Sequence, residues 1–140
     1  MPINVNLASA FEPKDSFAEA AAAWADAVAL GFAGIVPPST TVSTAAKAAF
    51  QTAILQAFTA RDVNLIDNAF TLFAAQVALG MAPTFVGTPP PSPLGAATVL
   101  GTNYPTSAAP ASALAAKIAL WAVTGLAALA APPNTVQPWA

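Results

Sequence analysis

Residues 16–31 read SFAEAAAAWADAVALG, and this stretch decides the kind of fold that the chain adopts. It opens with the S-x-x-E pattern of a capping box, in which the Ser16 and glutamate side chains bond free backbone N–H groups at a helix start. Apolar residues then recur at helical spacing, with Trp24 and Val28 on one face. Gly31 is a typical residue just beyond a helix end. The stretch therefore predicts an amphipathic helix.

Three further segments show the same helical spacing of apolar residues. The predicted helices cover about residues 44–58, with Ser43 as the cap, about residues 64–80, and a segment that starts near Pro110. Proline is tolerated at the first position of a helix. We expect this last helix to stop at Gly125, and continuation to residue 131 is the alternative. Four amphipathic helices predict an all-α fold, a small four-helix bundle.

The four helices resemble two copies of one helical hairpin. Residues 24–33 (WADAVALGFA) align with residues 73–82 (FAAQVALGMA), and each segment is followed by a proline cluster and a serine, at residues 37–39 and 90–92. The pattern is a helix, a glycine, a proline-containing loop and a second helix. A chance alignment of alanine-rich helices is the alternative explanation.

Proline divides the chain into a helical domain and extended segments. We expect one domain at residues 1–131, with an extended N-terminal arm at 1–14 and a long proline-rich loop at 81–109, followed by an extended tail at 132–140. Prolines exclude the loop from a helix or a central strand. The loop is uncharged and partly apolar, so we predict that it lies on a neighbouring subunit. Folding back over its own helices is the alternative.

Apolar residues in the loop and the tail are the candidate contacts with other subunits. Burying them would contribute about 25 cal/mol per Å² of apolar surface, before the cost of ordering the segments. The predicted interface residues are Phe85, Val86, Leu94, Val99, Leu100, Tyr104, Val136 and Trp139.

The composition argues against an enzyme. The 140 residues include no His and no Cys, which removes the commonest general base and the commonest zinc ligands. The candidate carboxylate pairs, Asp15 with Glu19 and Asp62 with Asp67, lie at predicted helix starts, where acidic residues favour the helix dipole. No phosphate-binding glycine motif and no calcium loop occurs. We therefore expect no catalytic residues, no metal and no cofactor.

Low charge points instead to a surface that other proteins cover. Charged residues make up 7% of the chain, against about 25% in typical soluble domains. The net charge is −2 with four scattered Lys and Arg residues, so we expect no nucleic-acid partner, because phosphate binding needs several cations on one face.

A membrane span is the obvious alternative for a chain with a mean hydropathy of +0.63. Residues 112–131 are long enough to cross a bilayer. They are mostly alanine, however, and they contain Lys117 and Gly125, without a flank rich in Lys and Arg to set an orientation. We expect no membrane span.

The stretch GMAPTFVGTPPP at residues 80–91, the sequence WAVTG at 121–125 and the Pro-Trp pair at 138–139 resemble a known group of proteins. These are small alanine-rich virion structural proteins encoded among the tail genes of tailed bacteriophages. The resemblance implies a non-enzymatic structural subunit of a tail or baseplate, located in the virion and assembled in the host cytoplasm. Its partners would be other virion proteins and further copies of itself, in a ring or a repeated array.

Two other functions fit the sequence less well. A membrane-associated helical protein would explain the hydropathy, and a carrier of a small apolar ligand would explain an alanine-lined bundle. The resemblance leaves open the symmetry, the copy number and the position in a particle, whether baseplate, neck or tail surface.

Overall fold

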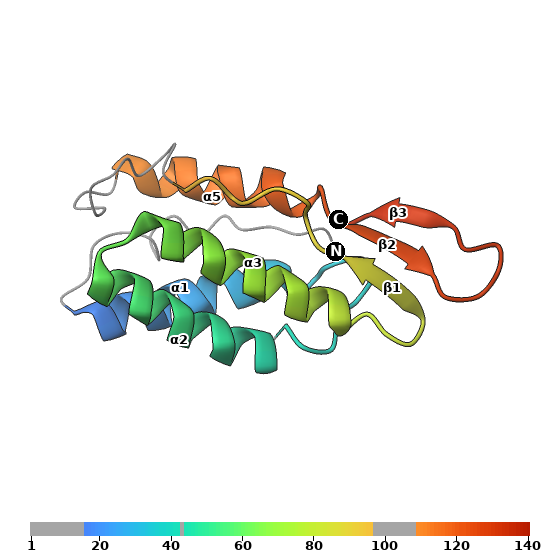
Figure 1. The fold of residues 1–140 in the computed structure, drawn as a ribbon, viewed down its shortest axis with the longest axis horizontal. Coiled ribbons are helices and arrows are strands. Elements are labelled where there is room, and N and C mark those ends of the chain that lie inside the picture. The colour runs from blue at the N-terminus through green and yellow to red at the C-terminus, as the bar shows by residue number, and fades with distance from the viewer. Residues whose placement is uncertain (1–15, 43, 97–108) are drawn as a thin grey trace.

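The computed structural model describes residues 16–42, 44–96 and 109–140, which form four helices and three strands (Figure 1). The mainly helical character expected from the sequence is confirmed. In chain order the elements are α1 (Phe17–Phe32), α2 (Ala45–Ala60), α3 (Val63–Leu79), β1 (Phe85–Thr88), α5 (Ala109–Ala122), β2 (Leu126–Leu129) and β3 (Val136–Pro138).

The strands make the prediction of an all-α fold wrong. They form one antiparallel sheet in the order β1-β2-β3, with Val86 opposite Ala128 and Ala128 opposite Val136. β2 has the sequence LAAL, and alanine and leucine both favour helix when considered alone. The strand forms because β1, about 40 residues earlier in the chain, and β3 supply its backbone partners, which a local pattern does not reveal.

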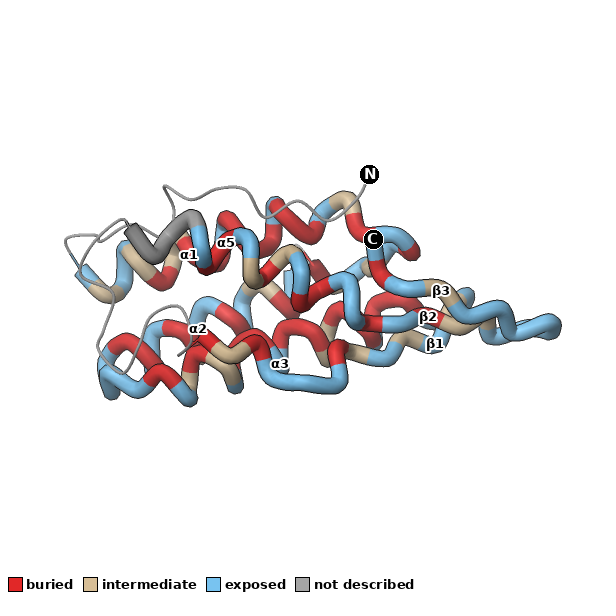
Figure 2. Tube along the Cα trace, turned by 90° about the horizontal axis from the view of Figure 1, so that it is seen from above, coloured by how far each residue is buried: buried red, intermediate tan, exposed pale blue. Residues whose placement is uncertain are grey.

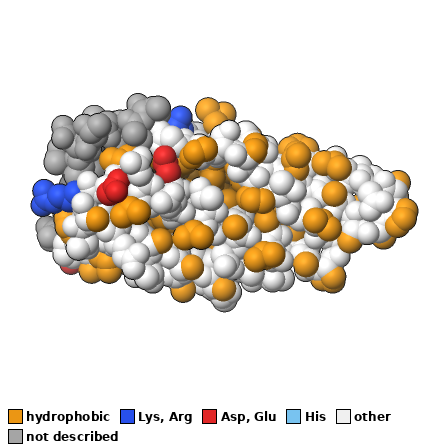
Figure 3. Space-filling model, in the orientation of Figure 1, with side chains coloured by type: hydrophobic (Ala, Val, Ile, Leu, Met, Phe, Trp, Pro, Cys, Tyr) orange, Lys and Arg blue, Asp and Glu red, His pale blue; other side chains and the backbone are white. Residues whose placement is uncertain are grey.

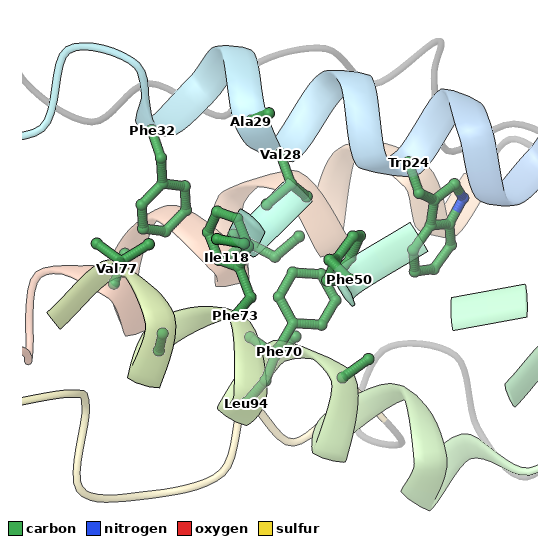
Figure 4. Close-up of a cluster of buried hydrophobic side chains, with 14 of the residues drawn as sticks. Trp24, Val28, Ala29, Phe32, Phe50, Phe70, Phe73, Val77, Leu94 and Ile118 are labelled. Atoms are coloured by element: carbon green, nitrogen blue, oxygen red, sulfur yellow. The ribbon is translucent and has the colours of Figure 1, made fainter. Parts of the chain in front are cut away.

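An aromatic cluster joins the helices. The Phe50 ring of α2 lies 4.9 Å from that of Phe70 and 5.6 Å from that of Phe73, both on α3, between ring centroids (Figure 4). Trp121 of α5 meets Phe70 edge to face at 6.0 Å, and Phe32 at the end of α1 meets Phe73 at 5.0 Å. All five rings are buried, so this cluster connects every helix that the structure describes.

The predicted helix ends are right in part. Ser16 Oγ accepts a hydrogen bond from the Glu19 N–H at 3.1 Å, as the capping pattern predicts. Gly31 does not end α1, because burial of Phe32 against α3 keeps both Gly31 and Phe32 in the helix. α5 ends at Ala122 and does not continue to residue 131. Ser43 lies outside the described residues.

The two aligned halves follow different paths after their glycines. Gly31 is inside α1, whereas Gly80 is the C-cap of α3. The chain after α1 forms turns that lead to α2, and the chain after α3 forms strand β1. The connection that follows the matched residues 24–33 and 73–82 therefore differs between the two halves, although a helix, α2 or α5, comes next in each.

The loop after α1 caps the C-terminus of α3. Thr41 Oγ1 donates to the Gln76 carbonyl at 2.6 Å, and Ser39 Oγ donates to the Val77 carbonyl at 2.8 Å. The Thr40 N–H donates to the Gly80 carbonyl at 3.0 Å. The last carbonyls of a helix have no partner within it, and α3 has no basic residue in its last turn. The Ser39 hydroxyl is the donor to the Val77 carbonyl, and the Thr41 hydroxyl is a second donor to the Gln76 carbonyl beside the Gly80 N–H.

We expect Thr41→Val to lower the free energy of unfolding by about 1 kcal/mol, because the partly buried Gln76 carbonyl loses one of its two donors and keeps the Gly80 N–H, while the side-chain shape is kept. Urea unfolding followed by circular dichroism measures the change. Thr52→Val is the matched control, since the Thr52 hydroxyl donates to the Ala48 carbonyl of its own helix on an exposed face. Equal effects of the two substitutions would contradict this assignment.

Part of the proline-rich loop folds back on its own helices. The Ala96 N–H donates to Asp67 Oδ1 of α3 at 2.8 Å, and Trp121 Nε1 of α5 donates to the Ser92 carbonyl at 2.8 Å. Leu94, between these two anchors, is buried in the core (Figure 4). The alternative interpretation therefore holds for residues 89–96, while residues 97–108 and the predicted arm at 1–14 lie outside the described residues.

Candidate functional site: an uncharged apolar sheet

Charge is unevenly distributed along the chain and over the surface. From residue 68 to residue 140 the sequence has one charged side chain, Lys117. In Figure 3 the charged side chains lie toward one end of the visible face, and the end that carries the sheet shows only hydrophobic and uncharged atoms. Lys47 and Asp26 form an ion pair at 2.7 Å between α2 and α1, and both side chains are exposed, so the pair contributes little stability.

Arg61 and Asp62, between α2 and α3, each have a structural role at a helix end. Arg61 has the left-handed backbone conformation of a helix C-cap, with φ of 55°. Its guanidinium carbon lies 6.0 Å from the centre of the Phe17 ring. Asp62 caps α3 instead, and its Oδ1 accepts from the Asn64 N–H at 2.9 Å. Both side chains thus have structural contacts at the end of the molecule remote from the sheet (Figure 1).

One face of the sheet carries apolar side chains that the described part of the chain leaves exposed. Side chains alternate between the two faces of a strand, and the register places six residues on this face. We call it the outer sheet face, and it consists of Val86, Thr88, Leu126, Ala128, Val136 and Pro138. Val86 is 61% exposed, Val136 59% and Leu126 42%. Thr88 is the only polar member of this face, and no member is charged.

The other face of the sheet is held by the helices. Ala127 of β2 is fully buried, and Phe85 of β1 packs partly buried against the core. A Cβ at Gly87 would lie 2.6 Å from the Ala78 carbonyl oxygen, so the strand backbone rests directly on α3. This contact fixes which face of β1 points outward.

Trp139 anchors β3 to the rest of the molecule. Its indole ring is buried and occupies the space that a side chain at Gly125 would need. Trp139 Nε1 donates to the Leu126 carbonyl at 3.0 Å, and the Trp139 N–H donates to the Gly125 carbonyl at 2.8 Å. Ala140 and Val36 exchange two backbone hydrogen bonds, at 2.8 and 3.0 Å. Residues 132–140 therefore do not form a separate extended tail.

The predicted interface residues fall into three groups. The prediction that Leu94 and Trp139 contact other subunits is wrong, because both side chains are buried in the core of their own chain. Phe85 is half-buried on the inner face of the sheet. Val86 and Val136 lie on the outer face, on either side of Ala128, which is the register partner of both. The structure does not describe Val99, Leu100 and Tyr104.

Sequence reasoning missed the part of the outer face that β2 and Pro138 supply. Leu126 and Ala128 lie in an alanine-rich segment whose two-residue alternation is weak, since Ala127, which points inward, is as apolar as its neighbours. The sequence does hold one signal for this strand. Gly125 before it and Pro132 and Pro133 after it are turn residues, and a short segment between two turns is typical of a hairpin strand.

Further exposed large apolar side chains border the sheet. Leu79 ends α3, Val123 follows α5, and Val36 bonds Ala140 beside β3. Their exposed fractions are 70%, 42% and 41%. The remaining exposed large apolar residues of the described chain lie on the helices, at Leu30, Leu55, Leu72 and Leu120.

Among residues 16–42, 44–96 and 109–140, no three His, Cys, Asp or Glu side chains are grouped as a metal site would require. Within the same residues, no helix has the length and apolar content needed to span a membrane. No protein-family model, curated protein or solved structure matches the chain significantly.

Proposed function

We propose that this chain is a non-enzymatic structural subunit of a bacteriophage particle, associated with the tail or baseplate and present in several copies. The observation that carries the structural role is the outer sheet face, an exposed apolar surface without charge. Such contiguous surfaces on small proteins are typical of contacts with other proteins. The assignment to a phage tail rests on the sequence resemblance at residues 80–91, 121–125 and 138–139.

In this proposal the helices act as a bundle that forms the rigid body of the subunit. The aromatic cluster around Phe50, Phe70 and Phe73 supports this role, because close-packed rings from several helices resist relative movement. The sheet acts as the contact element. Partners are other virion proteins and further copies of the chain, and the low charge leaves few ions to pair at the interfaces.

Purification of particles from the lysate in which this chain is made tests the proposal. Gradient-purified particles are digested, and labelled reference peptides measure the copy number of this chain relative to a major tail protein. We expect the chain to sediment with intact particles at several copies or more per particle. Recovery of the chain solely in the soluble fraction would contradict the proposal.

A further inference from the structure

Residues 89–96, which we call the strap, follow β1 in the chain. In Figure 1 the strap leaves β1 and runs back alongside α5. Its sequence is PPPSPLGA, so half of its residues are prolines, which have no N–H to donate. The strap belongs to no helix and no strand. It therefore lacks the regular ladder of backbone hydrogen bonds that holds the helices and the sheet.

Two side-chain hydrogen bonds hold the strap at its ends. On the α3 side, Asp67 Oδ1 accepts from the Ala96 N–H at 2.8 Å, and on the α5 side, Trp121 Nε1 donates to the Ser92 carbonyl at 2.8 Å. Leu94 lies between these two bonds and belongs to the buried cluster that Figure 4 shows. The helices, in contrast, have buried positions in turn after turn (Figure 2), so far fewer contacts hold the strap than hold a helix.

The sequence places its few late charges at the strap. Between residue 63 and residue 140 the charged side chains are Asp67 and Lys117. Asp67 bonds the Ala96 N–H, and a Cβ at Gly95 would lie 3.4 Å from Lys117 Cε and 3.7 Å from its Nζ. A hydrogen bond to an ionised acceptor is roughly twice as strong as one between neutral groups. Asp67 is therefore the stronger of the two polar anchors of the strap.

We propose that the strap is a latch that opens as one unit while the helices and the sheet stay folded, and that the bond between Ala96 and Asp67 controls it. Segments with few backbone hydrogen bonds open at a lower free energy than the core around them. α5 stays in place because Trp121 also packs edge to face on Phe70 at 6.0 Å, and because β2, which follows α5, remains paired with β1.

The latch gives the strap two states. In the closed state Leu94, its one large apolar side chain, is part of the chain's own core. In the open state Leu94 is exposed, the Trp121 indole N–H loses its acceptor, and the uncharged strap is available to another surface. The bond to Asp67 therefore sets the population of the open state. The opening is a property of the single chain and does not depend on the proposed role in a particle.

Hydrogen exchange of the free, full-length chain, followed by NMR, tests the latch. After correction for intrinsic rates, we expect the Ala96 N–H and the Trp121 indole N–H to exchange about 10-fold or more faster than the Phe70 N–H in the middle of α3. Low concentrations of urea should accelerate exchange at Phe70 and change the two strap signals little, because local opening exposes little surface. Equal exchange and equal urea dependence of all three signals would mean that the strap opens only when the chain unfolds, which overturns the inference.

Asp67→Ala tests whether the strap opens as one unit. It should accelerate exchange of the Ala96 N–H by about 10-fold or more, because a bond to a charged acceptor is lost. The Trp121 indole N–H, at the other end of the strap, should accelerate by a similar factor. Asp26→Ala is the matched control, since it removes an exposed carboxylate that pairs with Lys47, and it should leave both signals within about two-fold of the wild type.

Asp67→Asn keeps an oxygen acceptor without the charge and serves if the alanine variant does not fold. It should accelerate both strap signals about three-fold or more. The Trp139 indole N–H, which donates to the Leu126 carbonyl, is the internal reference and should not respond to either change at Asp67. A Trp121 indole signal that does not respond to the Asp67 variants, or an Asp26→Ala variant that accelerates both strap signals as Asp67→Ala does, overturns the inference.

Discussion

Replacing Trp139 with alanine is expected to lower the free energy of unfolding by about 3–5 kcal/mol. The buried indole fills the space beside Gly125, and its N–H is the donor to the Leu126 carbonyl. The substitution therefore leaves a cavity and removes a hydrogen bond at the point where β3 joins the molecule. Urea unfolding followed by the helical circular dichroism signal measures the effect.

Two matched variants separate the contributions. Trp139→Phe keeps much of the ring and loses the N–H donor, so we expect about half of the alanine effect. Val136→Ala, on the exposed outer face of the same strand, should cost less than about 1 kcal/mol. If Trp139→Ala unfolded at the same urea concentration as the wild type, residues 132–140 would be a separate arm, as the sequence alone predicts.

Phe70→Ala should have a loss of similar size, about 3–5 kcal/mol. Phe70 is fully buried and contacts Phe50 of α2 and Trp121 of α5 from its position on α3. Its removal opens a cavity where three helices meet, and α5 loses an aromatic contact with α3. Urea unfolding followed by tryptophan fluorescence measures the change.

Phe70→Leu is the control for this position, because leucine fills part of the same volume without an aromatic ring. We expect a loss of about 1–2 kcal/mol for it. A loss below about 1 kcal/mol for Phe70→Ala would mean that α5 does not pack on α3 through this ring, and the arrangement of the fourth helix would be wrong.

The helices could be predicted from the sequence because their signals are local. The capping pattern at Ser16 and the apolar spacing around Trp24 and Val28 act within a few residues of each other. The error at Gly31 has a non-local cause. The helix continues to Phe32 because that ring packs against Phe73, about 40 residues later in the chain.

The sheet could not be predicted for the same reason. β1 and β2 are about 40 residues apart, and the helix propensities of alanine and leucine in β2 outweigh the weak strand signal when the segment is considered alone. Of the candidate contact residues, Val86 and Val136 are exposed on the outer face, whereas Leu94 and Trp139 are buried. An apolar residue in a proline-rich segment looks the same in the sequence whether its own core or a partner covers it.

Accessibility of the outer sheet face inside an assembled particle tests the central claim most directly. The chain has no Cys, so Val136→Cys and Leu72→Cys each introduce a single thiol at exposed positions. The rate of maleimide labelling is compared between the free protein and purified particles. We expect labelling at position 136 to slow at least 10-fold in particles, and by a clearly larger factor than at position 72. Equal labelling of position 136 in the free and the assembled protein would contradict the account.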